Sequence, residues 1–218
     1  MTSRRHLLAA LAVLALAAPA HAADRVVTAP MKKVFPYLEA YLSMPPAERS
    51  RFAMAYRLTV DGAANPGLKV AIVRGAERTP LPLDGFGRIA RLPNLAMLKS
   101  DAKVELAGPQ GHKIGLALEL EPNVAAAAEM DAHALALACD QATTGAKKAA
   151  GVLGFAAPRL DRVVFQGAAG GQAVNAQGRA TPLAMVKGNP VFDPAKTPDA
   201  KAIRFTRAPT RLYLDKAS

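Results

Sequence analysis

The sequence predicts an α+β protein, mainly antiparallel β in a sandwich or partial barrel, with one long central helix and a short N-terminal helix. Short runs of alternating apolar and polar residues, separated by Gly, Pro, Asp and Asn, recur along most of the chain. This pattern is typical of antiparallel strands joined by turns. One Ala-rich stretch, from Asp131 to about Gly151, instead repeats at helical spacing. We therefore expect a β-rich half on either side of a single long helix.

The first 22 residues have the three parts of a cleavable export signal. Arg4 and Arg5 precede an apolar run at 7–18, and a small-residue segment ends at Ala22, where we expect cleavage. The apolar run is too short to span a bilayer, so we expect no transmembrane segment after cleavage. Ser3-Arg4-Arg5 also resembles the start of a twin-arginine signal, and a general secretory signal explains the same residues. The sequence therefore predicts a periplasmic or secreted protein.

The chain is strongly basic, which bears on its partners. Loss of Arg4 and Arg5 with the signal lowers the formal net charge from +11 to +9. Such a charge attracts anions, and in an exported protein these are anionic lipid or an envelope polymer rather than nucleic acid. Cys139 is the only cysteine, which excludes an internal disulfide, and in the central helix we expect it to be a small buried hydrophobe. The sequence carries no indication of oligomeric state.

After the signal, the pattern divides the chain into 23–122, 123–158 and 159–218, which can also form one continuous domain. The first part begins with a short helix from Lys32 to Leu42, ended by Pro45-Pro46. Its expected strands are 52–60, 69–73, 79–83, 87–93, 103–106 and 114–120. The stretch Thr79 to Pro93 resembles hairpins of immunoglobulin-like and transthyretin-like sandwiches, and this likeness implies a sandwich without implying an activity.

The central helix is predicted with both of its ends. Asp131 is placed to cap the first amide groups, and Gly151 can adopt the positive φ that ends many helices. Its apolar stripe consists of Leu135, Cys139, Ala142, Ala146, Ala149 and Leu153. Because most of these side chains are small, another surface can approach closely. We expect a structural helix packed between the two halves.

The second half is predicted to contain a strand at 161–166, a weaker extended pair within 172–183, a Pro-rich loop at 182–198 and a terminal hairpin. The hairpin consists of 202–206 and 211–215, with its apolar side chains facing the core, namely Ile203, Phe205, Leu212 and Leu214. Similar short anchors occur in the same order in both halves, such as Val70-Ala-Ile72 and Val163-Val-Phe165. This suggests two similar β modules.

Catalytic and metal-binding motifs are absent from the sequence. Glu129 and His133 are four residues apart without an HExxH motif, and no serine lies in a Gly-x-Ser-x-Gly turn. Glu119 and Glu121 are expected on the outer, solvated face of a strand, with no cause for a raised pKa. We therefore predict no catalytic residue, no metal ligand and no cofactor.

The function predicted from these observations is non-catalytic binding, or another role associated with the cell envelope. The candidate ligand-binding residues are Arg204, Arg211 and Tyr213, expected to point outward from the terminal hairpin and to form one anion-binding face. One alternative is a carrier of an apolar or lipid ligand, held between sheet and central helix in a cavity of several hundred Å³. A second alternative is an enzyme without a recognisable motif, for which His133, Cys139 and carboxylates should meet in a cleft.

Overall fold

The computed structural model describes residues 24–65, 67–151, 154 and 157–216. The predicted signal peptide (1–22) and Leu153 of the helical stripe lie outside the described residues. The helices are α1 (Met31–Val34), α2 (Leu38–Ser43), the 3-10 turn η1 (Pro46–Arg49), α3 (Leu95–Leu98) and α4 (Ala132–Ala149). The strands are β1 (Arg25–Pro30), β2 (Phe52–Val60), β3 (Ala63–Ala64), β4 (Lys69–Arg74), β5 (Glu77–Pro80), β6 (Lys103–Gly108), β7 (Ile114–Pro122), β8 (Glu129–Asp131), β9 (Arg162–Gln166), β10 (Gln172–Asn175), β11 (Ala180–Pro182), β12 (Ala184–Val186), β13 (Asn189–Phe192), β14 (Ala200–Arg204) and β15 (Arg211–Asp215).

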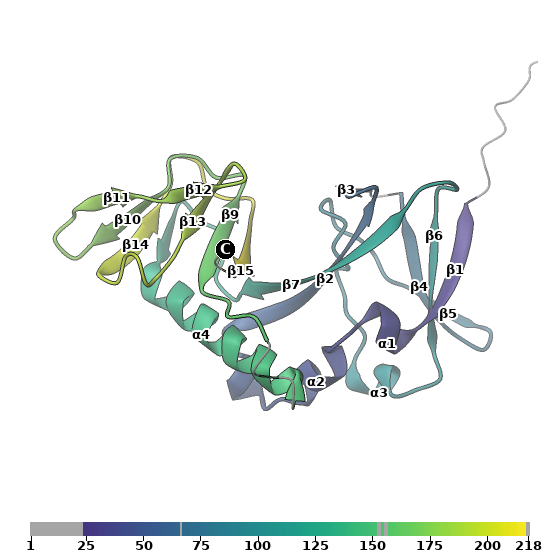
Figure 1. Ribbon diagram of the computed structural model, residues 1–218. Helices are drawn as coiled ribbons and strands as arrows, with labels where there is room; N and C mark the ends of the chain where they lie inside the picture. The colour runs from purple at the N-terminus through teal and green to yellow at the C-terminus, as the bar shows by residue number, and fades with distance from the viewer. Residues whose placement is uncertain (1–23, 66, 152–153, 155–156, 217–218) are drawn as a thin grey trace, which may run out of the picture.

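The strand pairings between these elements are antiparallel, so the predicted β-rich α+β class is confirmed. A four-stranded sheet in the order β1-β6-β4-β5 forms the part of the structure that we call the first lobe, and a second four-stranded sheet in the order β11-β10-β14-β8 forms the part that we call the second lobe. A seven-stranded sheet, β12-β13-β9-β15-β7-β2-β3, runs through both lobes (Figure 1). Buried side chains from Met31 to Leu214 form one hydrophobic cluster across the lobes.

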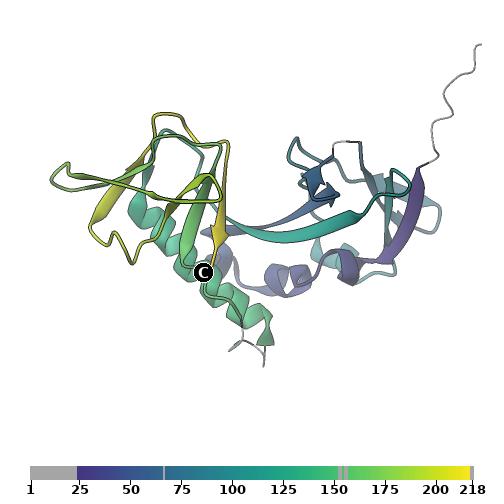
Figure 2. The same ribbon diagram turned by 45° about the horizontal axis from the view of Figure 1, so that its top comes forward.

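Strands β2 and β7 form the connection between the lobes. They pair over their whole length, from Phe52 opposite Pro122 to Val60 opposite Ile114. Figures 1 and 2 both show this long two-stranded ribbon spanning the space between the lobes, with the helices below it. The alternation in both sequences, which predicted the strands, gives the ribbon an apolar face toward the helices and a second face of alanines and charged residues.

Helix α4 confirms the predicted central helix and its N-cap. A carboxylate oxygen of Asp131 accepts hydrogen bonds from the amides of His133 and Ala134, at 2.7 and 3.1 Å. Gly151 follows the helix with φ of +58°, a conformation that glycine adopts without strain. Leu135, Cys139 and Ala142 are buried as expected, while Ala146 and Ala149 are half-buried and border a cavity described below.

The expected helix from Lys32 to Leu42 is two short helices, because Pro36 lies inside the predicted span. The proline ring has no amide hydrogen to donate, and Tyr37 after it adopts a left-handed conformation with φ of 65°. The hydroxyl of Tyr56 on β2 donates a hydrogen bond to the carbonyl of Pro36 and fixes this break against the ribbon.

The predicted loop at 182–198 contains a hairpin of β12 and β13. Lys187 and Gly188 both have positive φ, 48° and 77°, as a tight two-residue turn between strands requires. The lysine is unusual in that position, which explains why the turn has no clear signal in the sequence. Proline is tolerated in β13, where Pro190 lies opposite Met185.

The prediction of a terminal hairpin is wrong, since its two strands lie in different sheets. Strand β14 pairs with β10 and β8, whereas β15 pairs with β9 and, at Leu214 opposite Leu120, with β7. The chain crosses between the sheets at 205–210, where the amide of Thr210 donates to the carbonyl of Gln166. The four apolar side chains predicted to face the core are nevertheless buried.

The packing of α4 predicts the effect of enlarging its buried stripe. Ala142 is fully buried at the centre of this stripe, so Ala142→Leu is expected to overpack the core and to cost roughly 1 to 3 kcal/mol of unfolding free energy. Urea unfolding measures this loss. Thr144→Leu, on the exposed side of the same helix, serves as the control. Equal stability of wild type and Ala142→Leu would contradict the tight packing of the stripe.

Candidate functional site

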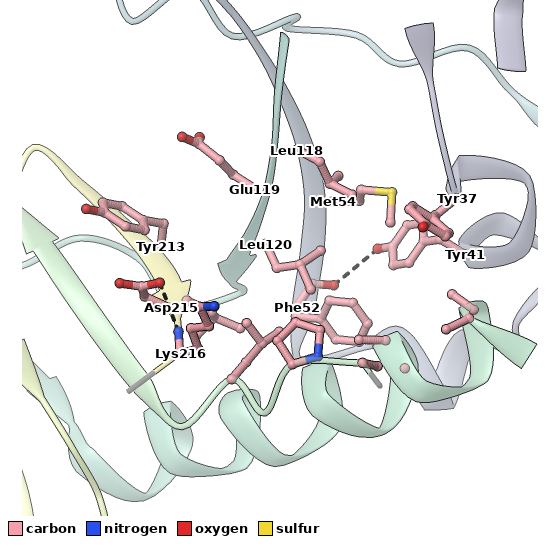
Figure 3. Close-up of a pocket in the computed structure, with 18 of the residues that line it drawn as sticks. Tyr37, Tyr41, Phe52, Met54, Leu118, Glu119, Leu120, Tyr213, Asp215 and Lys216 are labelled. Atoms are coloured by element: carbon pink, nitrogen blue, oxygen red, sulfur yellow. Dashed lines mark hydrogen bonds between the residues drawn. The ribbon is translucent and has the colours of Figure 1, made fainter. Parts of the chain in front are cut away.

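A cavity of about 700 Å³ lies where the ribbon, α2, the second half of α4 and the end of β15 meet. We call it the junction pocket. Its described lining is largely apolar: Met44, Phe52, Met54, Ala117, Leu118, Leu120, Gly145, Ala146, Ala149, Ala150, Ala157, Pro158, Leu160 and Leu214, together with Tyr37, Tyr41, Tyr213, Glu119, Asp215 and Lys216. Figure 3 shows Leu120 pointing from β7 toward the helix, whereas the carboxylate of Glu119 points away from it.

Small residues of α4 make room for the pocket. Gly145, Ala146 and Ala149 present almost no side chain to it, and Phe52 of β2 lies directly over Gly145. A Cβ atom at Gly145 would lie only 2.7 Å from Cζ of Phe52, which explains a glycine inside a helix, where it ordinarily costs stability. The Ala-rich stripe predicted from the sequence therefore serves close packing in its first half and borders an open space in its second.

Aromatic and methionine side chains form the end of the pocket at α2. The hydroxyl of Tyr41 donates a 3.1 Å hydrogen bond to the carbonyl of Phe52, and the two rings meet edge to face. Tyr37 is 56% exposed, a high value for a large aromatic side chain bordering a cavity. Its position follows from the break at Pro36, so the interruption of the predicted helix shapes this end of the pocket.

The opposite end carries the charged residues of the lining, Glu119, Asp215 and Lys216. This end forms where β15 separates from β7, because the only paired residues of the two strands are Leu214 and Leu120. Asp215 forms an ion pair with Arg162 at 3.2 Å, and its other carboxylate oxygen accepts a hydrogen bond from the amide of Lys216. Figure 3 shows Tyr213, Asp215 and Lys216 on one side of the pocket and Tyr37 and Tyr41 on the other.

A charge cluster occupies the face of the ribbon that points away from the helices. It consists of three arginines and three carboxylates, namely Arg57, Asp84, Arg88, Glu119, Glu121 and Arg211. Arg211 of β15 pairs with both glutamates of β7, and its Nε lies 3.0 Å from Glu121 Oε1. Glu119 also pairs with Arg57 of β2 at 2.9 Å, and Glu121 with Arg88 of the 84–88 turn.

The centre of the cluster is largely removed from water, while Arg57, Asp84 and Arg88 around it are partly exposed. The side chain of Arg211 is only 5% exposed, and each glutamate side chain is 15% exposed. Burial raises the pKa of Glu121 above its ordinary value despite the nearby arginines. Burial and the charges of Arg88 and Arg57 lower the pKa of Arg211. The expectation that these glutamates are solvated, with no cause for a raised pKa, is therefore wrong for Glu121.

The predicted exposed face of Arg204, Arg211 and Tyr213 is not formed. Arg204 is on β14 and pairs at the surface with Glu129 of β8, at 3.0 Å. Arg211 is buried in the charge cluster, with its guanidinium carbon 5.6 Å from the centre of the Tyr213 ring. Tyr213 borders the junction pocket. Alternation along β15 correctly places Arg211 opposite the core, but it does not indicate that other charged residues cover that side.

The other candidate residues of the sequence lie apart from one another. His112 contacts Asp61 at 2.6 Å at the end of the ribbon, and His133 is exposed at the start of α4. Cys139 is buried, as predicted, and burial raises the pKa of its thiol to about 12. Within the described ranges, no group of three His, Cys, Asp or Glu residues is arranged to hold a metal ion. No helix of the described chain is long and apolar enough to cross a membrane.

Comparison with known proteins gives no relative from which a role could be inferred. No protein-family model matches the sequence, and no curated protein or solved structure is significantly similar to the chain. The junction pocket and the charge cluster are therefore the features of the described chain that bear on its function.

The charge cluster predicts a pH-dependent effect of removing Arg211. Arg211→Met keeps a long side chain but leaves Glu119 and Glu121 buried with one arginine fewer, which should cost about 3 kcal/mol at pH 7.5. The folded-state pKa of Glu121 is already raised, so folding favours its protonated form. At lower pH the protonated form of Glu121 is more populated, so the unfolding free energy lost in Arg211→Met should be smaller at pH 5 than at pH 7.5.

Urea unfolding of wild type and variant at both pH values measures this difference. Arg74→Met, which removes an exposed ion pair with Glu77, should unfold at the wild-type urea concentration and is the control. If Arg211→Met loses the same unfolding free energy at both pH values, the destabilisation does not come from the ionised glutamates.

Proposed function

We propose that the protein is a non-catalytic carrier of an apolar ligand with a single hydrocarbon chain, held in the junction pocket. The observation that carries this proposal is a cavity of about 700 Å³ in which most lining residues are apolar. Pockets of roughly 300 to 1,000 Å³ with apolar walls and a few polar groups are typical of small-molecule sites. Such a ligand would lie between the sheet and the central helix.

The shape of the lining favours a chain over a compact ring system. The pocket runs from Tyr37 and Tyr41 at α2 to Tyr213 and Lys216 at β15, under Leu118 and Leu120 (Figure 3). Its floor is the small-residue surface of α4. Methionine and leucine side chains adapt to flexible hydrocarbon, and burial of each methylene contributes about 0.8 kcal/mol.

The charge cluster supports an enzymatic role less well than the junction pocket supports a carrier role. Both glutamates of β7 are paired with arginines, and Asp84 is paired with Arg88 at 2.8 Å. The two described histidines lie apart from the cluster, at the end of the ribbon and at the start of α4. Cys139 is buried with a raised thiol pKa, which opposes formation of the nucleophilic thiolate.

The proposed place of action is outside the cytoplasm, in the periplasm or beyond. This part rests on residues 1–22, where two arginines, an apolar run and a small-residue segment resemble an export signal. Hydrocarbon chains are poorly soluble in water, so an aqueous compartment next to a membrane is where a carrier of this kind is useful.

Filling the pocket is the direct test of the proposal. Ala146→Phe places a ring in the cavity and should weaken binding of dodecanoate by at least about tenfold in calorimetric titration. Ala136→Phe, on the same helix but outside the pocket lining, is the matched control and should bind like the wild type. For the wild type, affinity should rise from octanoate to dodecanoate by up to about fourfold per methylene.

Two outcomes would contradict the carrier proposal. One is dodecanoate binding that is equal in both phenylalanine variants, provided that circular dichroism shows both to be folded. The other is an affinity that does not change with chain length. Mass spectrometry of the purified chain under native conditions should in addition show a retained hydrocarbon ligand.

The export signal is tested separately. Replacement of Arg4 and Arg5 by lysine should leave uncleaved precursor in the cytoplasm if the twin-arginine route is used, because that route depends on the arginine pair. Cell fractionation measures the distribution. Normal export of the variant would assign the protein to the general secretory route, and an uncleaved wild-type chain in the cytoplasm would contradict export.

A further inference from the structure

The two ends of the junction pocket differ in polarity. At α2 the lining consists of Tyr37, Tyr41 and Met44, and the hydroxyl of Tyr41 already donates a hydrogen bond to the carbonyl of Phe52. At the β15 end lie the charged residues of the described lining. A pocket with one apolar and one charged end suits an amphiphile, a molecule with a hydrocarbon chain and a polar head group, in a single orientation.

The charges at the β15 end are not equally available to a ligand. Glu119 is paired with Arg57 and Arg211, and Asp215 is paired with Arg162. Lys216 forms no ion pair with a described residue; of its groups, only the backbone amide is engaged, with the carboxylate of Asp215. Since both acids are neutralised by arginines, the charge left to meet a ligand is the positive charge of the Lys216 ammonium group.

We propose that the ligand is an amphiphile with an anionic head group, a carboxylate or a phosphate, bound at Lys216 with its chain directed toward α2. This inference rests on the proposed carrier function and adds the chemical class and the orientation of the ligand. The head group lies where β15 separates from β7, at the exposed side chain of Lys216. The head group therefore keeps part of its hydration while the chain is buried.

The test compares ligands that share a dodecyl chain and differ in head group: dodecanoate, dodecyl phosphate, dodecanol and dodecyltrimethylammonium. In calorimetric titration of the purified chain at low salt, both anions should bind about fivefold more tightly than dodecanol, as one partly exposed charge pair allows. The cation should bind most weakly. Raising the salt concentration should reduce the difference between the anions and the alcohol.

Lys216→Gln should remove the preference for anions and leave the affinity for dodecanol unchanged. Lys201→Gln is the matched control, because Lys201 is also an exposed lysine but lies on β14, away from the pocket lining. A preference for a carboxylate over a phosphate would identify a free fatty acid as the source, and the reverse preference would identify a phospholipid-like head group; either result supports an anionic ligand.

The results also separate failure of this inference from failure of the carrier proposal. If Lys216→Gln retains the anion preference, or if dodecanol binds as tightly as dodecanoate to the wild type, the head-group inference is wrong. The pocket then still stands, provided that Ala146→Phe weakens binding of all four ligands. If Ala146→Phe weakens none of them, the carrier proposal is wrong and the head-group inference fails with it.

Discussion

The pairing of β2 with β7 is the constraint on which the rest of the structure depends. Because side chains alternate along a strand, one register of this ribbon places Leu118 and Leu120 toward the helices and Glu119 and Glu121 on the opposite face. A slip by one residue would exchange the two sets, moving carboxylates into the apolar pocket and leucines into the charge cluster. The register of β2 with β7 therefore determines both the apolar lining of the junction pocket and the position of the charge cluster.

The charge cluster supports this register without being a large source of stability. Burial of Arg211, Glu119 and Glu121 costs much of what their attraction to the surrounding charges returns, so the complete cluster contributes little net free energy. An arrangement that leaves any one of these groups buried and unpaired is, however, strongly disfavoured. Arg211 contacts glutamates of β7 from β15, so the cluster also fixes how the last strand is placed against the ribbon, where the two share a single residue pair.

The elements that could be predicted from the sequence are those specified by local signals. Alternation over nine residues identified β2, and the side chain of Asp131 marked the start of α4. The break at Pro36 was equally local and could have been found from the missing amide hydrogen. The β12–β13 hairpin had no comparable signal, because a lysine occupies a left-handed turn position that glycine or asparagine usually fills.

The candidate site could not be predicted in the same way, since it depends on contacts between distant segments. Alternation indicated which side of β15 faces away from the core, but not that the 84–88 turn and the ribbon would cover that side and bury Arg211. Likewise, the small residues of α4 were visible in the sequence, but close packing and an open cavity require the same residues. Close packing, with Phe52 over Gly145, and the open cavity beside Ala149 can be told apart only in the folded structure.

The long-range pairing of Arg211 affects how the chain folds during its synthesis. Glu121 and Glu119 precede their buried arginine by 90 and 92 residues, and β9 also pairs with β15. During synthesis, the ribosome releases both glutamates and the whole ribbon long before β15 exists. The first lobe and the ribbon can pair in that interval, but the edge of β7 that faces β15 stays uncovered and open to chaperones, or to aggregation, until β15 has been synthesised.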